Sequence, residues 1–214
     1  MNKKTNILIV NDDGIESYGI AKLAAMAANF GDVWVVAPEG QCSGMSQRLT
    51  IFSELNVQER EFPATVRAAY SVSGTPADCV KVALKSLLPV WPDYVFSGIN
   101  AGFNAGYDIA YSGTVGAAME AVLHDIPAIA FSTQHDGSYE ITDKYLMPIA
   151  EELMQKSNAG EIWNVNFPGC QACDFKGIVR GTEAAPSFFF ENDYQKLERD
   201  GKIVFTPFAK LLGP

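Results

Sequence analysis

Short, continuous apolar runs alternate along this chain with longer segments in which apolar residues repeat at helical spacing. Such runs are typical of strands that are buried on both faces of a parallel sheet. They cover residues 6–11, 32–37, 94–96, 126–131 and 162–166. The helical segments between them cover residues 18–30, 75–87, 113–123 and 144–155. This order predicts an α/β fold with a doubly wound, mostly parallel sheet.

The ends of several predicted elements carry local signals. Gly31 is predicted to stop the first helix, since glycine commonly follows the last helical turn. Thr75 followed by Pro76 has the form of an N-cap with proline at the first helical position. Ser112 is predicted to cap the third helix. The intervening stretches are predicted to be a loop at 38–48 and hairpin-like strands at 49–73.

The alternation ends after Pro168, so the last part of the chain differs from the rest. A length of 214 residues suits a single domain. We therefore expect one α/β domain over residues 1–214, with a core at about 1–168 and a C-terminal extension at about 169–214. The extension is predicted to hold irregular strands and to act as an arm in oligomerisation.

The chain is acidic, with a formal net charge of −9. This charge disfavours polymeric nucleic acid and anionic membranes as partners. A small phosphorylated substrate is compatible with it if a bound cation offsets the field. The apolar run at 7–10 is interrupted at Asn11, too early for a signal peptide, and no run is long enough to span a bilayer. The expected location is soluble and cytoplasmic.

Four cysteines, Cys42, Cys79, Cys170 and Cys173, are too few and too scattered for a disulfide framework. The last two form a C-x-x-C pair, which admits a metal or redox function. No second pair of ligands is spaced to complete a zinc site, because His124 and His135 lie far away in sequence. Reduced cysteines in a loop are the favoured interpretation.

Chemically unusual loops follow three of the predicted strands, where ligands bind in open α/β sheets. Asp12 and Asp13 end the first strand, and paired carboxylates are costly there unless they are solvated or neutralised. A divalent cation with oxygen ligands, such as Mg²⁺, Mn²⁺ or Ca²⁺, would neutralise them. Gly14 permits the bend that two adjacent side chains need to reach one ion. A polar turn is the alternative reading.

The loops after the second and third of these strands add hydroxyl, amide and glycine groups. The stretch from Gln41 to Ser46 is a weak signal, since Ser-Gly pairs are mostly ordinary turns. Asn100 follows a buried strand and offers a neutral oxygen to a metal, and Asn104 offers a donor to phosphate. The helix start at residues 112–114 (Ser112, Gly113, Thr114) is a ready anion site, although a structural serine cap is the common case.

Five strings in the chain resemble the SurE family of survival proteins and 5′/3′-nucleotidases. They are ILIVNDDGI (7–15), AP followed by SG (37–38 and 43–44), GTPADCVKVAL (74–84), SGINAGFNAGYDIAYSGTVGAAMEA (97–121) and WNVNFP (163–168). The match covers most of the chain up to Pro168, and the long block at 97–121 is highly specific.

The resemblance implies a Rossmann-like core with a C-terminal arm, exchanged between subunits of a homodimer or homotetramer. It implies a phosphoric monoester hydrolase of the 5′-nucleotidase or acid phosphatase-like type, with one Mg²⁺ or Mn²⁺ per subunit and nucleoside monophosphates as substrates. The family's metal ligands correspond to Asp12, Asp13, Ser43 and Asn100. Its phosphate contacts correspond to Asn104, Ser112, Gly113 and Thr114, and the expected catalytic residues are Asp12, Asp13, Asn104 and Ser112.

The sequence also departs from the family and leaves alternatives open. Where relatives often carry basic residues, this chain has the stretch from Glu39 to Cys42. The difference affects which nucleotide the chain is expected to prefer. A response-regulator receiver is disfavoured because the strand at 94–96 is followed by no phosphoacceptor carboxylate. A phosphatase with an aspartate nucleophile is disfavoured because Asn11 stands where its first acid belongs. A metal- and nucleotide-binding module without turnover stays open, and no histidine is assigned as the base.

Overall fold

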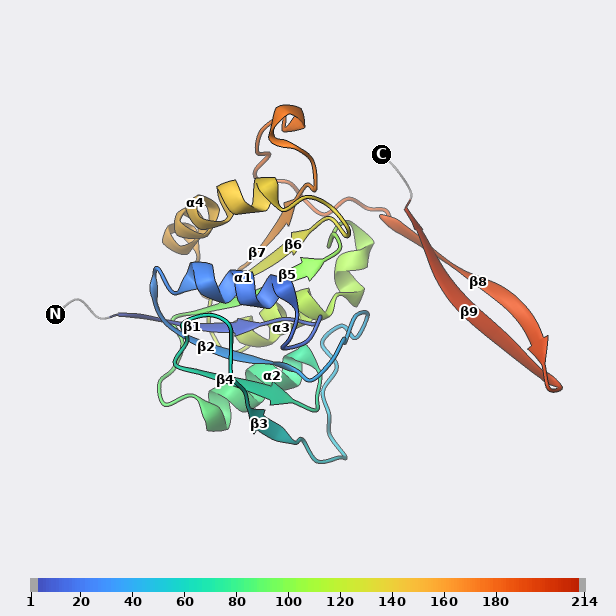
Figure 1. The fold of residues 1–214 in the computed structure, drawn as a ribbon, viewed down its shortest axis with the longest axis horizontal. Helices are drawn as coiled ribbons and strands as arrows, with labels where there is room; N and C mark the ends of the chain where they lie inside the picture. Colours follow the sequence, from blue (N-terminus) through green and yellow to red (C-terminus); the bar gives the residue numbers. More distant parts are fainter. Residues whose placement is uncertain (1–3, 212–214) are drawn as a thin grey trace.

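The computed structural model describes residues 4–211 and is built around one seven-stranded sheet (Figure 1). The sheet order is β3-β4-β2-β1-β5-β6-β7, and every neighbouring pair is parallel except β3 and β4. The strands are β1 (Thr5–Val10), β2 (Gly31–Pro38), β3 (Val57–Glu59), β4 (Ala68–Val72), β5 (Tyr94–Ala101), β6 (Ala128–Thr133) and β7 (Ile162–Phe167). The predicted α/β class is confirmed.

Helices cover both faces of the sheet, as a doubly wound fold requires (Figure 1). The four α-helices are α1 (Tyr18–Ala27), α2 (Pro76–Val82), α3 (Gly113–Val122) and α4 (Glu140–Lys156). Buried residues of α1 and α4 pack with one face of the strands, around Phe96 and Phe131. Buried residues of α2 and α3 pack with the other face, around Leu8 and Val95. The two apolar layers hold the sheet between them.

Some element boundaries differ from those that the sequence predicts. The helix expected at 75–87 is α-helical only to Val82 and continues as a π-helix over Ala83–Leu87. The first helix already ends at Ala27, and Gly31 begins β2 instead of stopping a helix, so that prediction was wrong. A Cβ on Gly31 would lie 2.0 Å from the Thr5 carbonyl oxygen. The glycine is therefore required by the close approach of β1 and β2.

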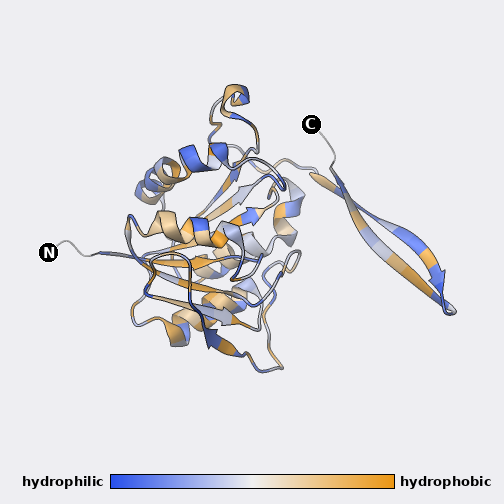
Figure 2. Ribbon diagram, viewed as in Figure 1, coloured by the Kyte–Doolittle hydropathy of each residue, from blue (hydrophilic) through white to orange (hydrophobic). Residues whose placement is uncertain are grey.

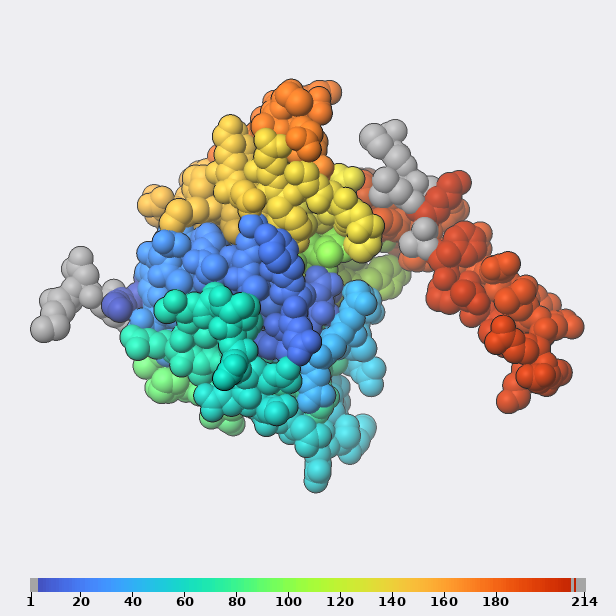
Figure 3. Space-filling view, in the orientation of Figure 1, coloured from blue at the N-terminus to red at the C-terminus, as the bar shows by residue number. Residues whose placement is uncertain are grey.

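The C-terminal extension forms a separate hairpin of β8 (Phe190–Arg199) and β9 (Lys202–Leu211), after a short 3₁₀ turn at Ala172–Asp174. The two strands pair with each other in a two-stranded antiparallel sheet and project away from the core (Figures 1 and 3). Apolar residues recur along both strands (Figure 2), and Ile203, Phe205 and Phe208 are each at least half exposed. The expected strands are present, although they form a regular hairpin.

Three sequence-based expectations concern cysteines, membrane spans and chain ends. All four cysteines are free thiols. Among the described residues, no helix has the length and apolar character that crossing a bilayer demands. The described part of the chain leaves out residues 1–3 and 212–214. The expected domain at 1–214 includes both ends, and the signal-peptide argument includes the first.

Candidate active site

The loops after β1, β2 and β5 meet at the carboxyl ends of three neighbouring strands. The Ile15 N–H donates to the Pro38 carbonyl at 2.9 Å, which joins the first two loops. A Cβ on Gly14, whose φ is +96°, would lie 3.1 Å from the backbone of Gly40. A Cβ on Gly19 would lie 2.1 Å from the carbonyl oxygen of Ile99 in β5. Glycines thus allow backbones from three segments to converge here.

Asp12 is the buried acid of this site, with only 3% of its surface exposed. The Thr114 hydroxyl donates to Asp12 Oδ1 at 2.5 Å. A Cβ on Gly113 would lie 2.8 Å from the Asp12 Cβ, so only glycine lets the start of α3 come this close. Burial raises the pKa of Asp12 to about 6, even though hydrogen bonds from Thr114 lower it, and the charge of Asp13 raises it further.

Asp13 connects the first loop to the end of β5. Its Oδ2 accepts a hydrogen bond from the Ala101 N–H at 3.0 Å. Burial raises the pKa of Asp13, and the hydrogen bond from Ala101 opposes that rise. Ala101 is the last residue of β5, so this bond holds Asp13 at the carboxyl end of that strand. Both acids therefore face the same group of loops with raised pKa values.

The two other expected metal ligands are Asn100 and Ser43. Their chain neighbours Ala101 and Cys42 form hydrogen bonds with Asp13 and Asp12. The Asn100 side-chain nitrogen donates to the Gly102 carbonyl at 2.8 Å, so its amide oxygen is the atom free to bind a cation. Ser43 is exposed and accepts from Gln41 at 3.2 Å. In the described structure Ser43 makes no hydrogen bond to either acid. Its neighbour Cys42 does, since the Cys42 N–H donates to the Asp12 carbonyl at 2.6 Å.

The start of α3 is confirmed as a capped helix N-terminus. The Ser112 hydroxyl accepts from the Val115 N–H at 3.1 Å and caps the helix. The Thr114 N–H and hydroxyl both form hydrogen bonds with the carboxylate of Asp12 and lower its pKa. The positive end of the α3 dipole therefore lies beside the acidic loop, with Gly113 between them.

Asn104 belongs to the loop after β5 and contacts the ends of the next two strands in the sheet, β6 and β7. Its side-chain nitrogen donates to the Ser132 hydroxyl at 2.8 Å, and its N–H donates to Asn166 at 2.9 Å. The Asn104 carbonyl accepts from Asn164 at 2.8 Å and from Asn166 at 3.0 Å. Within the described residues, these bonds fix Asn104 but none joins it to Asp12 or Ser112.

The sequence matches the family model described as "Survival protein SurE" over residues 7–187. The chain belongs to the SurE family. It is 43% identical to the 5′-nucleotidase SurE of Clostridium botulinum strain Loch Maree over 204 residues, covering 93% of this chain and 80% of that protein. It is 38% identical to the 5′-nucleotidase SurE of Protochlamydia amoebophila, over 90% of this chain and 74% of the relative.

A solved SurE structure shares the fold as well as the sequence. The crystal structure of the SurE protein from Aquifex aeolicus superposes with a TM-score of 0.77 at 34% identity, covering 96% of this chain and 83% of that one. Every residue of the candidate site falls inside the range matched by the SurE model, whereas the hairpin β8–β9 lies beyond it.

The donor atoms of this SurE site suit a hard cation. No three side chains from His, Cys, Asp and Glu gather in the described residues. The site instead offers two carboxylates with an amide and a hydroxyl nearby, and all of these are oxygen donors of the kind that Mg²⁺ and Mn²⁺ take. Burial raises the pKa of both Asp12 and Asp13, and a cation bound between them would favour their ionised forms.

Three residues near the SurE site were given no part in it by sequence reasoning. Asn11 is fully buried, and its side-chain nitrogen donates to the Gly14 carbonyl at 2.9 Å and to Ser17 at 2.8 Å, which holds the acidic turn. His135 lowers the pKa of Asp13 through its charge, although burial outweighs it. Burial, followed by the charge of Asp13, raises the pKa of Tyr139. The segment between β6 and α4 thus lies close enough to affect Asp13 electrostatically, which the spacing of the sequence does not reveal.

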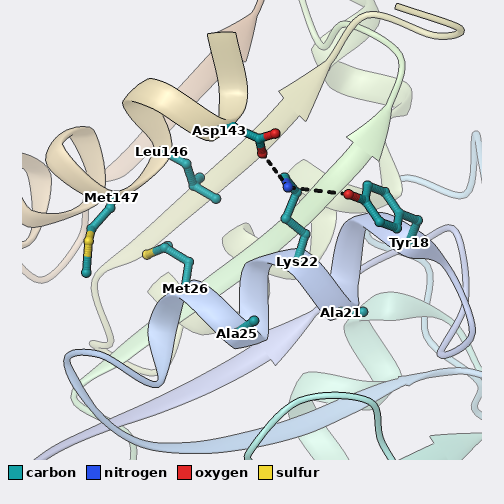
Figure 4. Close-up of a pocket in the computed structure, with 8 residues that line it drawn as sticks. All are labelled: Tyr18, Ala21, Lys22, Ala25, Met26, Asp143, Leu146 and Met147. Carbon is teal, nitrogen blue, oxygen red and sulfur yellow. Dashed lines mark hydrogen bonds and ion pairs between the residues drawn. The ribbon is translucent and has the colours of Figure 1, made fainter. Parts of the chain in front are cut away.

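Two cavities lie beside the site and do not include Asp12 or Asp13. One of about 460 Å³ opens between α1 and α4, where Lys22 forms an ion pair with Asp143 and points toward Tyr18 (Figure 4). A larger one of about 780 Å³ lies over β7 and reaches Asn104 at one end.

Proposed function

We propose that this SurE protein is a divalent-metal-dependent phosphomonoesterase that hydrolyses nucleoside 5′-monophosphates, and 3′-monophosphates in addition, to nucleoside and phosphate. The observation that carries the proposal is the Asp12–Asp13 pair held against the N-terminus of α3. This arrangement sets a cation site beside an anion site, which is what a metal-assisted attack on a phosphate ester needs. The names of relatives at 43% identity support the reaction type.

One Mg²⁺ or Mn²⁺ per subunit is proposed to be held by Asp12, Asp13, Ser43 and Asn100. When bound, this cation supplies polarisation of the phosphoryl group and lowers the pKa of an attacking water. Thr114 fixes the orientation of the Asp12 carboxylate through its hydroxyl. The Ala101 N–H does the same for Asp13. The chain thus aims both acids before substrate arrives, which avoids reorganisation during the reaction.

The phosphoryl oxygens are proposed to be held by Asn104, Ser112, Gly113 and Thr114. The N-terminus of α3 contributes its dipole and main-chain donors. Asn104 is held rigidly by its bonds to Ser132, Asn164 and Asn166, so its position costs little entropy when substrate binds. Asp12, Asp13, Asn104 and Ser112 are the proposed catalytic residues, because they would contact the cation or the reacting group.

The hairpin β8–β9 is proposed to join subunits in a homodimer or homotetramer. Its strands pair only with each other in the described structure, and they expose apolar side chains. Such a surface gains most by burial in another subunit. A soluble, cytoplasmic protein that binds neither polymeric nucleic acid nor membranes is the proposed setting, in keeping with the net charge of −9.

Phosphate release from AMP, GMP and a 3′-nucleotide tests the function directly. The protein is stripped with a chelator and assayed with and without added Mn²⁺ or Mg²⁺, and the Asp12→Asn variant is compared on p-nitrophenyl phosphate. We expect release only with added metal and a large loss in the variant. Nucleotide binding without phosphate release would instead favour a binding module, and undiminished turnover by Asp12→Asn would remove Asp12 from the mechanism.

A further inference from the structure

An aromatic surface lies next to the proposed phosphate site and has no part in the chemistry described so far. Tyr111 directly precedes the cap residue Ser112, so their Cα atoms are about 3.8 Å apart. The side chains of Tyr107, Tyr111 and Phe188 are all about half exposed, at 50%, 52% and 46%. Three large rings exposed together at the rim of a site require an explanation.

The rings are ordered with respect to each other. Tyr111 and Phe188 are nearly parallel, with 17° between their planes and 6.5 Å between their centroids. Tyr107 meets Phe188 edge-to-face, with centroids 5.3 Å apart and planes at 71°. The three rings therefore form one ordered aromatic cluster that is about half exposed to solvent.

The backbone fixes Phe188 in this position, although it belongs to the C-terminal extension. Gly106 forms a β-bridge with Phe188, and the Tyr107 N–H donates to the Ser187 carbonyl at 2.9 Å. The next two N–H groups, of Phe189 and Phe190, donate to Asp108 Oδ2 at 2.7 and 2.9 Å. A Cβ on Gly106 would lie 2.1 Å from the Ser187 oxygen, so this contact depends on glycine.

Tyr111 is also tied to the loop that carries the proposed metal ligand Ser43. The Tyr111 carbonyl accepts from the Ser46 N–H at 3.0 Å, and the Ser46 hydroxyl donates to the Ala110 carbonyl at 2.8 Å. Tyr111 therefore stands between the loop after β2 and the start of α3. A phosphate bound at Ser112 would therefore lie beside the backbone of Tyr111.

We propose that Tyr111 and Phe188 form the surface on which the nucleobase of the substrate stacks, with Tyr107 positioning Phe188. The inference rests on the proposed nucleotidase function and assigns specificity to residues outside the metal and phosphate sites. Every nucleobase has a π-face, so this surface favours nucleotides over base-free phosphate esters without strong preference among bases. Phe188 lies one residue beyond the range matched by the SurE model.

The test compares AMP with ribose 5-phosphate, which keeps the sugar and the ester but lacks the base. Steady-state KM and kcat are measured with Mn²⁺ for the wild type, Tyr111→Ala, Tyr111→Phe and Phe188→Ala. Stacking is worth a factor of roughly 5 to 150 in affinity. We expect both alanine variants to raise the KM for AMP by at least about 5-fold more than the KM for ribose 5-phosphate. Tyr111→Phe keeps the ring and should keep the AMP preference.

Trp91→Ala is the matched control, because Trp91 is 50% exposed but precedes β5 and so lies at the opposite end of that strand. It should change neither KM. Equal effects of the Tyr111 and Phe188 variants on both substrates, with or without a change in oligomeric mass, would overturn the stacking proposal while leaving the nucleotidase function intact. A wild type that cleaves neither ester would overturn the proposed function and this inference with it.

Discussion

At the scale of single residues, the site depends on a carboxylate that the fold buries. The sequence indicated that Asp12 and Asp13 would be costly unless they were solvated or neutralised, because paired acids follow a buried strand. It could not predict the contact with Thr114, which lies 102 residues further along the chain. Periodicity shows which residues end a strand, but the partner of a buried polar group depends on the packing of distant segments.

The burial of Asp12 predicts a pH-dependent stability for the metal-free protein. Its pKa is about 6 in the folded state against 3.8 ordinarily, so the stability that its neutral form provides is complete below pH 3.8 and is lost as the pH rises through 6. Asp12→Asn should therefore raise the free energy of unfolding of chelator-treated protein at pH 8 by about 3 kcal/mol. Urea unfolding at pH 8 and at pH 4 measures this.

The two pH values provide an internal comparison for this prediction, since Asp12 is mostly protonated at pH 4 and the variant should then gain little. Asp174→Asn, at an exposed acid, serves as the matched control. A variant that is less stable than the wild type at pH 8 without metal would show that burial of this carboxylate is not costly.

Thr114 offers a second prediction at the same scale. Thr114→Val keeps the side-chain shape but removes the hydroxyl that donates to Asp12. A hydrogen bond to a charged group is worth about 1.5–3 kcal/mol, so kcat/KM for AMP should fall roughly 10- to 100-fold. Thr114→Ser restores the donor and should recover most of the rate. Equal rates for the valine variant and the wild type would show that this contact does not orient Asp12.

At the scale of elements, helix starts were easier to predict than helix ends. Thr75 and Pro76 gave the start of α2, and the structure adds Asp78, whose carboxylate closes a capping box. Asp78 also accepts from the Thr50 N–H at 2.9 Å and from its hydroxyl at 2.7 Å. The start of α2 therefore anchors the loop at 39–56, a contact between segments that local signals do not contain.

This anchoring predicts a stability loss for Asp78→Ala. Burial alone would raise the pKa of Asp78, but the hydrogen bonds from Thr75 and Thr50 lower it below its ordinary value. Removing the carboxylate leaves those donors unpaired, so the free energy of unfolding should fall by about 2 kcal/mol or more. Urea unfolding at pH 7 measures the loss, and Glu54→Ala, at an exposed position, is the control. A loss no larger than the control's would contradict the anchoring role.

At the scale of the whole molecule, the alternation of strands and helices was sufficient to predict the α/β class. It did not give the strand order, because β1 lies in the middle of the sheet and β3–β4 extend one edge. The hairpin β8–β9 was harder still. Its residues are mostly exposed, so the sequence there lacks the contrast between buried and solvent faces that marks the core strands.

The hairpin gives a prediction about assembly. Phe205 is 57% exposed on β9, and Phe205→Glu should shift the protein toward monomers, because a charge is costly in an apolar interface. Light scattering coupled to size exclusion measures the mass at several protein concentrations. Ser53→Glu, at an exposed position outside the hairpin, adds the same charge and is the matched control. An unchanged mass for Phe205→Glu would exclude this face of the hairpin as a subunit contact.

The most direct test of the whole account is anomalous X-ray scattering from a crystal soaked in Mn²⁺. One peak per subunit is expected at the loops after β1, β2 and β5, within about 2.3 Å of oxygens of Asp12, Asp13 and Asn100 and with the Ser43 hydroxyl turned toward it. Absence of a peak at these residues, or a peak elsewhere such as Cys170 and Cys173, would contradict the claim that oxygens from three loops hold one catalytic cation.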